Sequence, residues 1–152
     1  MPLSPILRLQ SDHVPQLEKL LVSNNLPSED CAAQPGIFYG VFENDRLVAA
    51  GGLEAAQNFC LLRSLVVHPD YRGRGLARSL AEFLIREAEA AGRAAIYLLT
   101  ETAAAYFENM GFSHVARDEV PGAVARTRQF SSLCPDSASC LRLNLPRPPA
   151  QV

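Results

Sequence analysis

The apolar residues near the start of the chain change their spacing after residue 10. Ile6–Leu9 is a short apolar run. It is followed by apolar residues three or four positions apart, at Val14, Leu17, Leu20 and Leu21. That spacing puts the apolar side chains on one face of a helix, and either Ser11 or Asp12 is suited to cap its first turn. We expect a strand, a helix and then a short second helix over Cys31–Ala33 capped by Ser28.

The middle of the chain carries three apolar segments of strand length, separated by pairs of turn residues. The segments are Ile37–Glu43, Leu47–Glu54 and Phe59–Val67. Asn44-Asp45 lies between the first two and Gln57-Asn58 between the second and third, and such polar pairs favour a reversal of the chain. The pattern predicts three antiparallel strands joined as a meander.

A helix and a strand follow the third of these segments. Apolar residues recur at helical spacing, at Leu76, Leu80, Phe83 and Leu84. The helix should run to about Ala91, because Gly92 is suited to end it. Ala95–Leu99 is an apolar segment, so the pattern predicts a strand, helix and strand unit.

The last third of the chain predicts shorter elements. Ala103–Met110 fits a helix that ends at Gly111, and Phe112–Ala116 fits a strand that leaves it. A short helix is expected over Gly122–Thr127. The alternation of apolar and polar residues in Cys140–Leu145 predicts the last strand.

Length and composition indicate one folded domain. The chain has 152 residues, of which 48% are apolar, and we place the domain at residues 1–145 with a frayed proline-rich tail at 146–152. Its 14 basic and 16 acidic residues give a net charge of −2, which lacks the basic excess that nucleic-acid binding needs. No apolar run approaches the roughly 20 residues of a membrane span, and the start of the chain lacks the pattern of an export signal. We expect a cytoplasmic protein that binds neither nucleic acid nor membrane.

The cysteines and histidines do not form a clear metal site. The four cysteines, Cys31, Cys60, Cys134 and Cys140, have unrelated spacings and are expected to be free thiols in a reducing compartment. Cys134 and Cys140 could bind an arsenical or a transition metal as thiolates, but two cysteines without a third ligand make a weak site. Structural packing is the alternative. His13, His68 and His114 are scattered, so no metal is expected.

A glycine-bearing turn between a strand and a helix is the most informative segment. It reads Arg72-Gly73-Arg74-Gly75. Glycines let backbone N–H groups face a ligand, and the start of a helix adds the positive end of its dipole. With Arg78, the segment brings three guanidinium groups to this helix start, which suits a ligand with several phosphates. On the glycines alone, an ordinary turn is the alternative, since their spacing matches neither the G-x-x-x-x-G-K-S/T loop nor the dinucleotide fingerprint.

These residues resemble the signature of the GNAT N-acyltransferase superfamily, Arg/Gln-x-x-Gly-x-Gly/Ala. Arg72, Gly75 and Ala77 meet it, and the preceding L-x-V-x-P pattern is met by Leu65, Val67 and Pro69. Ala105–Phe112 is similar to the later helix of that family and the Gly-Phe pair that follows it, so the resemblance covers about residues 6–116.

The resemblance implies a fold and a coenzyme site. The fold is α/β (α+β), a single GNAT-type domain with a mixed, mostly antiparallel, splayed sheet flanked by helices. The strands ending at Val67 and Leu99 would part to hold acetyl-CoA. By analogy, the backbone of Leu65, Val66 and Val67 would pair with the acetyl and pantetheine portion. The residues around the pyrophosphate would be Arg72, Gly73, Arg74, Gly75, Ala77 and Arg78.

A narrower resemblance concerns the acceptor. Tyr97–Thr102, Val120-Pro121 and Phe130–Pro135 with Cys140 resemble a GNAT subgroup found in arsenic-resistance operons, which is similar to the acetyltransferase domain of N-acetylglutamate synthase. This implies transfer of acetyl to the primary amine of a small amino acid or amino-acid analogue, with a link to arsenic resistance. A second copy of the chain is a further candidate partner.

Acetyl transfer by direct attack of an amine needs a base, because an ammonium acceptor must first lose a proton. Glu54, at the end of a predicted central strand, is the candidate base, and Glu101 is the second. The alternative for each is a solvated charge at a strand end.

The leaving thiolate can be protonated by an acid, and the sequence is ambiguous on this point. The superfamily often has a tyrosine four residues before the glycine of its Gly-Phe pair, but here that position is Phe107. Tyr106 is one residue earlier and about 100° away around a helix, so it would point elsewhere. It is kept as a candidate acid, with water or Thr100 as alternatives. Phe107 is expected to pack against the coenzyme.

Arg63 interrupts an apolar strand and is a candidate clamp for a carboxylate of the acceptor, to which Thr100 would also lie close. A solvent-facing or acid-paired arginine is the alternative. Arg126 and Arg128 are other candidates for the clamp, and His68 is expected to be a turn residue.

Two other functions stay open on the sequence. Phe107, at a position where the family often has an acid, favours a catalytically silent coenzyme A sensor. Cys134 and Cys140 favour a thiol-based arsenical-binding protein.

Overall fold

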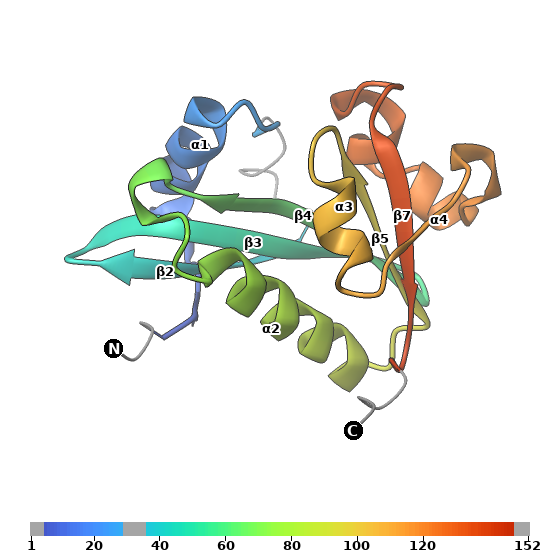
Figure 1. The fold of residues 1–152 in the computed structure, drawn as a ribbon, viewed down its shortest axis with the longest axis horizontal. Coiled ribbons are helices and arrows are strands. Elements are labelled where there is room, and N and C mark those ends of the chain that lie inside the picture. Colours follow the sequence, from blue (N-terminus) through green and yellow to red (C-terminus); the bar gives the residue numbers. More distant parts are fainter. Residues whose placement is uncertain (1–4, 29–35, 148–152) are drawn as a thin grey trace. The chain divides into compact units, whose positions relative to one another are not determined.

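Seven strands form one open sheet within residues 5–28 and 36–147, the part of the chain that the computed structural model describes (Figure 1). Their order across the sheet is β1-β2-β3-β4-β5-β7-β6. The strands are β1 (Leu7–Arg8), β2 (Ile37–Glu43), β3 (Arg46–Ala56), β4 (Phe59–Val67), β5 (Ala95–Thr100), β6 (Ser113–His114) and β7 (Ser139–Asn144). β4 and β5 run parallel, and the pairs β1–β2, β2–β3, β5–β7 and β6–β7 are antiparallel. The predicted mixed, mostly antiparallel sheet is confirmed.

Helices connect and flank these strands. The α-helices are α1 (Val14–Ser23), α2 (Leu76–Ala90), α3 (Ala104–Glu108) and α4 (Gly122–Ala125). Short 3-10 helices lie at Ser11–His13, Pro69–Tyr71 and Arg117–Glu119, and Gln129–Leu133 forms a π-helix. Packing divides the chain into unit 1, Met1–Glu54 with Leu62–Arg86, and unit 2, Ala55–Leu61 with Glu87–Val152.

In unit 1 the two long helices pack on different apolar surfaces of the strands. Leu17 and Leu21 of α1 lie in a cluster with Phe38 and Val66, whereas α2 packs against another cluster. That second cluster contains Val41, Val48, Ala49, Leu76 and Leu80. A register shift between Val41 and Phe42 pairs these residues with Ala49 and Leu47. Val48 is therefore an extra residue, which lets the neighbours Val48 and Ala49 both face the α2 cluster.

Unit 2 has its own core around β5 and β7. Tyr97 of β5, Cys140 of β7, Val124 of α4 and Phe130 of the π-helix are buried in one cluster. Leu98 and Leu141 are also buried, and strand alternation directs them to the opposite face. The helix α4 and the π-helix therefore cover one face of this part of the sheet.

The start of the chain differs from the sequence prediction. The first strand is Leu7–Arg8 rather than Ile6–Leu9. Neither Ser11 nor Asp12 caps the first α-helix, because both lie in a 3-10 turn and His13 is the N-cap residue. Proline is tolerated only in the first turn of a helix, and Pro15 therefore sets the start of α1 at Val14. The helix predicted over Cys31–Ala33 lies outside the described residues.

The middle of the chain agrees with the prediction most closely. β2 and β4 have the predicted bounds, and turns at Asn44-Asp45 and Gln57-Asn58 connect β2 to β3 and β3 to β4. The helix α2 ends at Ala90, followed by Gly92 at φ 74°. The meander and the strand, helix and strand unit are confirmed.

The ends of several other elements differ. β3 extends beyond Leu47–Glu54, β5 extends one residue past Leu99, β7 begins and ends one residue before Cys140–Leu145, and three elements are shorter than predicted: Ala103–Met110, Phe112–Ala116 and Gly122–Thr127. Local patterns indicate that an element exists, but turns set its ends. In the tail predicted to fray, Arg147 N–H donates to Glu89 Oε2 at 3.0 Å.

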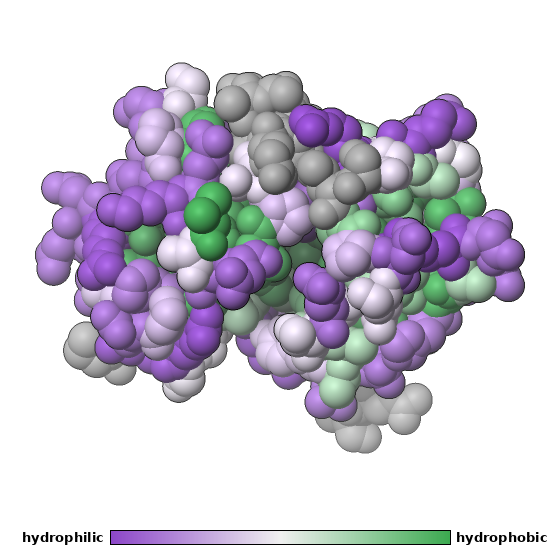
Figure 2. Space-filling model, turned by 90° about the horizontal axis from the view of Figure 1, so that it is seen from above, coloured by the Kyte–Doolittle hydropathy of each residue, from purple (hydrophilic) through white to green (hydrophobic). Residues whose placement is uncertain are grey.

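The surface carries apolar residues in small groups. In Figure 2 hydrophilic residues surround these groups on the face that is drawn. Leu7, Val22 and Ile37 are the large apolar residues exposed in the described ranges. Within these ranges no helix is both long enough and apolar enough to cross a membrane.

Three cysteines in the described residues, Cys60, Cys134 and Cys140, are free thiols. Burial raises the pKa of Cys60 from 9.0 to about 11, partly opposed by the charge of Arg93. Burial likewise raises the pKa of Cys140 to about 11, partly opposed by the charge of Arg117. The thiolate forms of both groups are therefore disfavoured in the folded protein.

We predict that Cys60 and Cys140 resist alkylation by iodoacetamide in the native protein at pH 8 and react after denaturation, as measured by peptide mass spectrometry. Because their pKa values are raised by folding, the stability linked to the two protonated thiols is full below pH 9 and is lost as pH rises through about 11. Fast labelling of either thiol in the native state at pH 8 would contradict this.

Candidate active site

The turn after β4 is held by backbone and side-chain hydrogen bonds in unit 1. His68 N–H donates to the Val48 carbonyl at 2.8 Å, and His68 Nδ1 accepts from Asp70 N–H at 3.1 Å. Arg46 Nη2 lies 2.6 Å from His68 Nε2. These contacts support the interpretation of His68 as a turn residue, and they fix where the chain leaves the sheet.

The glycine turn that follows exposes backbone at the start of α2. Gly75 has φ 78°, and no atom lies within 4 Å of the place where a Cβ would be. The first intrahelical bond runs from Ser79 N–H to the Gly75 carbonyl at 3.0 Å. The N–H groups of the preceding first-turn residues therefore have no partner within the helix. With the helix dipole, this is an arrangement that binds anions.

The three arginines of this turn have different surroundings. Arg74 and Arg78 are exposed, and the Arg74 guanidinium lies 4.7 Å from the centroid of the Tyr71 ring. Arg72 has two partners within the protein: Nε donates to the Val67 carbonyl at 3.2 Å, and Nη2 donates to Asn24 Oδ1 at 2.6 Å. The guanidinium of Arg72 therefore links the end of β4 to the end of α1. Its predicted contact with a phosphate stays a prediction.

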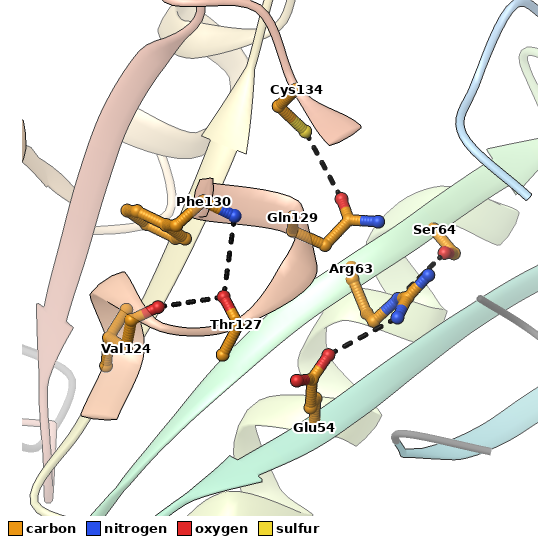
Figure 3. Close-up of polar contacts among 8 residues, drawn as sticks. All are labelled: Glu54, Arg63, Ser64, Val124, Thr127, Gln129, Phe130 and Cys134. Atoms are coloured by element: carbon orange, nitrogen blue, oxygen red, sulfur yellow. Dashed lines mark hydrogen bonds and ion pairs between the residues drawn. The ribbon is translucent and has the colours of Figure 1, made fainter. Parts of the chain in front are cut away.

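Glu54 and Arg63 form a buried ion pair in unit 1. Arg63 Nη1 lies 3.3 Å from Glu54 Oε1, and the side chains are 1% and 11% exposed for Arg63 and Glu54 respectively (Figure 3). The Arg63 guanidinium also lies 5.3 Å from the Phe38 ring centroid. The alternative of a solvated charge is wrong for both residues, and the acid-paired alternative for Arg63 is confirmed. The partner charge favours the ionised carboxylate of Glu54.

A strained residue follows Arg63 in the strand. Ser64 has φ 59°, a conformation that a non-glycine residue in a strand rarely adopts. Its Oγ accepts from Arg63 Nε at 3.2 Å. The backbone therefore changes direction immediately before Leu65–Val67, the segment expected to face the acetyl and pantetheine portion. Serine at this position gives no sequence signal, so sequence reasoning missed this feature.

The candidate residues of unit 2 lie at the end of β5 and on α3. Thr100 Oγ1 accepts from Ala103 N–H at 3.0 Å and so supports the start of α3. The Phe107 ring is buried against Phe112, with centroids 5.6 Å apart. The rings of Tyr106 and Phe107 meet edge to face at 5.4 Å. Contacts of these residues with a coenzyme stay predictions. The other candidates, Glu101, Arg126 and Arg128, are exposed.

The two C-terminal cysteines are in different settings. Cys134 Sγ donates to Gln129 Oε1 at 3.3 Å, while Cys140 is buried with its pKa raised to about 11. Soft metals and arsenicals bind the thiolate, so the state of Cys140 opposes such a site. Across the described ranges, no group of three or more His, Cys, Asp or Glu residues could hold a metal ion.

The sequence and the fold both match known proteins. The model of the acetyltransferase (GNAT) family matches residues 7–112. The sequence is 33% identical over 92 residues to the uncharacterized N-acetyltransferase YjgM of Escherichia coli strain K12, a match that covers 55% of each chain. The match thus spans about half the length of that curated relative.

Solved structures share the fold at low sequence identity. N-acetylglutamate synthase from Neisseria gonorrhoeae, complexed with coenzyme A and N-acetyl-glutamate, superposes with a TM-score of 0.81 at 16% identity, covering 97% of this chain and 36% of that one. The ribosomal-protein-S18-alanine N-acetyltransferase from Escherichia coli gives 0.72 at 20% identity, covering 97% of each chain. At these identities the likeness shows the fold alone.

We predict that Glu54→Ala lowers the free energy of unfolding by about 3–5 kcal/mol, because it leaves the buried charge of Arg63 without its carboxylate partner. The double variant Glu54→Leu with Arg63→Met should be more stable than Glu54→Ala, because apolar groups can replace a buried ion pair at little loss. Urea unfolding of the three proteins measures this. A double variant less stable than Glu54→Ala would contradict the assignment.

Proposed function

Because the chain belongs to the GNAT acetyltransferase family, we propose that it transfers an acetyl group from acetyl-CoA to the primary amine of a small amino acid or amino-acid analogue. The observation that carries this proposal is the turn at Gly75, where the unbonded N–H groups of a helix start and two exposed arginines, Arg74 and Arg78, adjoin open space. This arrangement fits the pyrophosphate of a coenzyme. N-acetylglutamate synthase, which shares the fold, binds coenzyme A.

Within this proposal the coenzyme meets three groups of residues. The N–H groups of Gly73–Ala77 and the side chains of Arg74 and Arg78 bind the pyrophosphate. The backbone of Leu65–Val67 binds the acetyl and pantetheine portion, and the bend at Ser64 sets its direction. Phe107 packs against the coenzyme from α3. Acetyl-CoA supplies the activated acyl group, and the protein forms no covalent intermediate.

The acceptor is proposed from chemistry and likeness together. The amine nitrogen attacks the thioester carbon, the carbon–sulfur bond breaks, and the sulfur leaves as a thiolate that takes up a proton. Glu54 removes the proton of the ammonium group, directly or through water. Arg63 holds the Glu54 carboxylate, which the 3.3 Å contact supports, and binding the acceptor carboxylate is its second proposed role. Thr100 and Tyr106 are candidates to lie near the acceptor and the thiolate.

The identity of the acceptor is the finest part of the proposal. One structural relative is bound to N-acetyl-glutamate and another is named for an alanine of a ribosomal protein, so the fold serves free amino acids and proteins. The resemblance of Tyr97–Thr102 and Phe130–Pro135 to the arsenic-operon subgroup supports a free amino acid or its analogue, and with it a link to arsenic resistance.

The test of the function is release of coenzyme A thiol from acetyl-CoA with three sets of amines: free amino acids, the same amines without the carboxyl group, and peptides. We expect turnover with free amino acids. Turnover with peptides alone would contradict the proposed acceptor. Phe107, buried where a thiolate acid is often found, favours a silent coenzyme A sensor as the second candidate, which would bind acetyl-CoA without turnover of any amine.

We predict that Gly75→Ala weakens acetyl-CoA binding by about 10-fold or more, because the new Cβ occupies the open space at the turn and strains its backbone. Gly92→Ala is the matched control, because Gly92 also has a positive φ and open space around its Cβ position, at the other end of α2. Both variants should lose about 1–2 kcal/mol of stability, but only Gly75→Ala should lose affinity in calorimetry. Equal affinity of the two variants would remove the coenzyme from this turn.

We predict that Glu54→Gln lowers kcat/KM by about 10²–10⁴-fold at low pH and less as pH rises, since rising pH supplies the free amine without a base. Glutamine retains an oxygen that can accept from Arg63, which limits the loss of stability. Tyr106→Phe should change the rate little. pH–rate profiles of both variants measure this, and a silent Glu54→Gln beside a large pH-dependent loss in Tyr106→Phe would reverse the two roles.

A further inference from the structure

A π-helix in unit 2 is anchored from both sides. Cys134 N–H donates to the Gln129 carbonyl at 3.1 Å, and Ser131 N–H donates to the Thr127 carbonyl at 2.8 Å. The Thr127 hydroxyl donates to the Val124 carbonyl at 2.8 Å and accepts from Phe130 N–H at 3.4 Å (Figure 3). Phe130 is buried in the core of unit 2. π-Helices are rare and are often found at functional sites.

The side chain of Gln129 is buried, with 7% of the residue exposed. Its Oε1 accepts a hydrogen bond from Cys134 Sγ at 3.3 Å. Its Nε2 has no hydrogen-bond partner among the described residues. Because a thiol donates and an amide oxygen accepts, the contact with Cys134 fixes which end of the amide carries the two N–H donors (Figure 3). Burying such donors without an acceptor is unfavourable.

We infer that Gln129 Nε2 donates a hydrogen bond to a carbonyl or carboxylate oxygen of the acceptor, which makes Gln129 a specificity-determining residue. The inference rests on the proposed function. An amide NH₂ group offers donors only, so it recognises the oxygen of a carboxyl or amide group and cannot recognise the ammonium group. Cys134 is then a positioning residue, because its S–H holds the amide in the orientation that presents Nε2.

A structural explanation of the same observation predicts a different result. If the buried amide has no ligand, an apolar residue of similar length should only make the protein more stable. Methionine is unbranched and has nearly the length of glutamine. Gln129→Met therefore separates the two explanations, because a ligand-binding amide should leave a variant that is equally or more stable but has lost its preference for carboxylates.

The experiment compares acceptor kinetics of the wild type, Gln129→Met, Cys134→Ala and Cys134→Ser. The acceptors are L-alanine and ethylamine, and L-glutamate and 4-aminobutyrate, pairs that differ by the α-carboxyl group. For Gln129→Met we expect the KM of the amino acid to rise about 10-fold or more, while the KM of the paired amine and of acetyl-CoA and the Tm stay the same or the Tm rises. Cys134→Ala should show a smaller rise, and Cys134→Ser should not, since a hydroxyl also donates to Oε1.

The outcomes separate this inference from the proposed function. A higher Tm with unchanged KM values in Gln129→Met, or equal rises for both members of a pair, overturns the inference while the wild type still acetylates amino acids. A wild type that binds acetyl-CoA in calorimetry but acetylates none of the four amines overturns the proposed function, and the role of Gln129 fails with it.

Discussion

A guanidinium group inside a sheet must be paired, and the arrangement of unit 1 depends on how Arg63 meets this requirement. Its ion pair with Glu54 at 3.3 Å joins β3 to β4, and its Nε donates to Ser64 Oγ. The second contact supports Ser64 in its left-handed conformation. The strand that leaves this bend ends at Val67, from which the turn into α2 begins. Charge burial, backbone strain and the position of the helix start are thus parts of one structure.

The anion-binding character of the turn follows from backbone more than from side chains. The N–H groups at the start of α2 are fixed by the helix, whereas a side-chain charge must be held in place by its neighbours. Arg72 performs that second task, because its guanidinium bonds to Val67 and Asn24, and Asn24 Nδ2 in turn donates to the Leu20 carbonyl at 2.8 Å. The exposed Arg74 and Arg78 are the side chains left for long-range attraction of phosphate. Arginines in one short motif therefore have different tasks, which their spacing cannot reveal.

The sequence predicts those features whose causes are local. Alternation and turn pairs suffice for β2 and β4, and Gly92 suffices for the end of α2. The pairing of Glu54 with Arg63 was also within reach, since a two-residue turn at Gln57-Asn58 puts both positions on one face of a hairpin and a long side chain can span the diagonal between them.

Other features depend on tertiary contacts. The bend at Ser64 rests on a buried arginine, and the π-helix at Gln129 rests on the hydroxyl of Thr127 and on Phe130 in the core. Nothing in the residues themselves marks these places, because serine and glutamine are common in ordinary strands and helices. They share one property, since each keeps an arrangement that folding alone disfavours: a positive φ at Ser64 and a buried donor without a protein acceptor at Gln129. Folded chains retain such arrangements mainly where function requires them. The two places where local reasoning fails are therefore those where a ligand best explains the geometry.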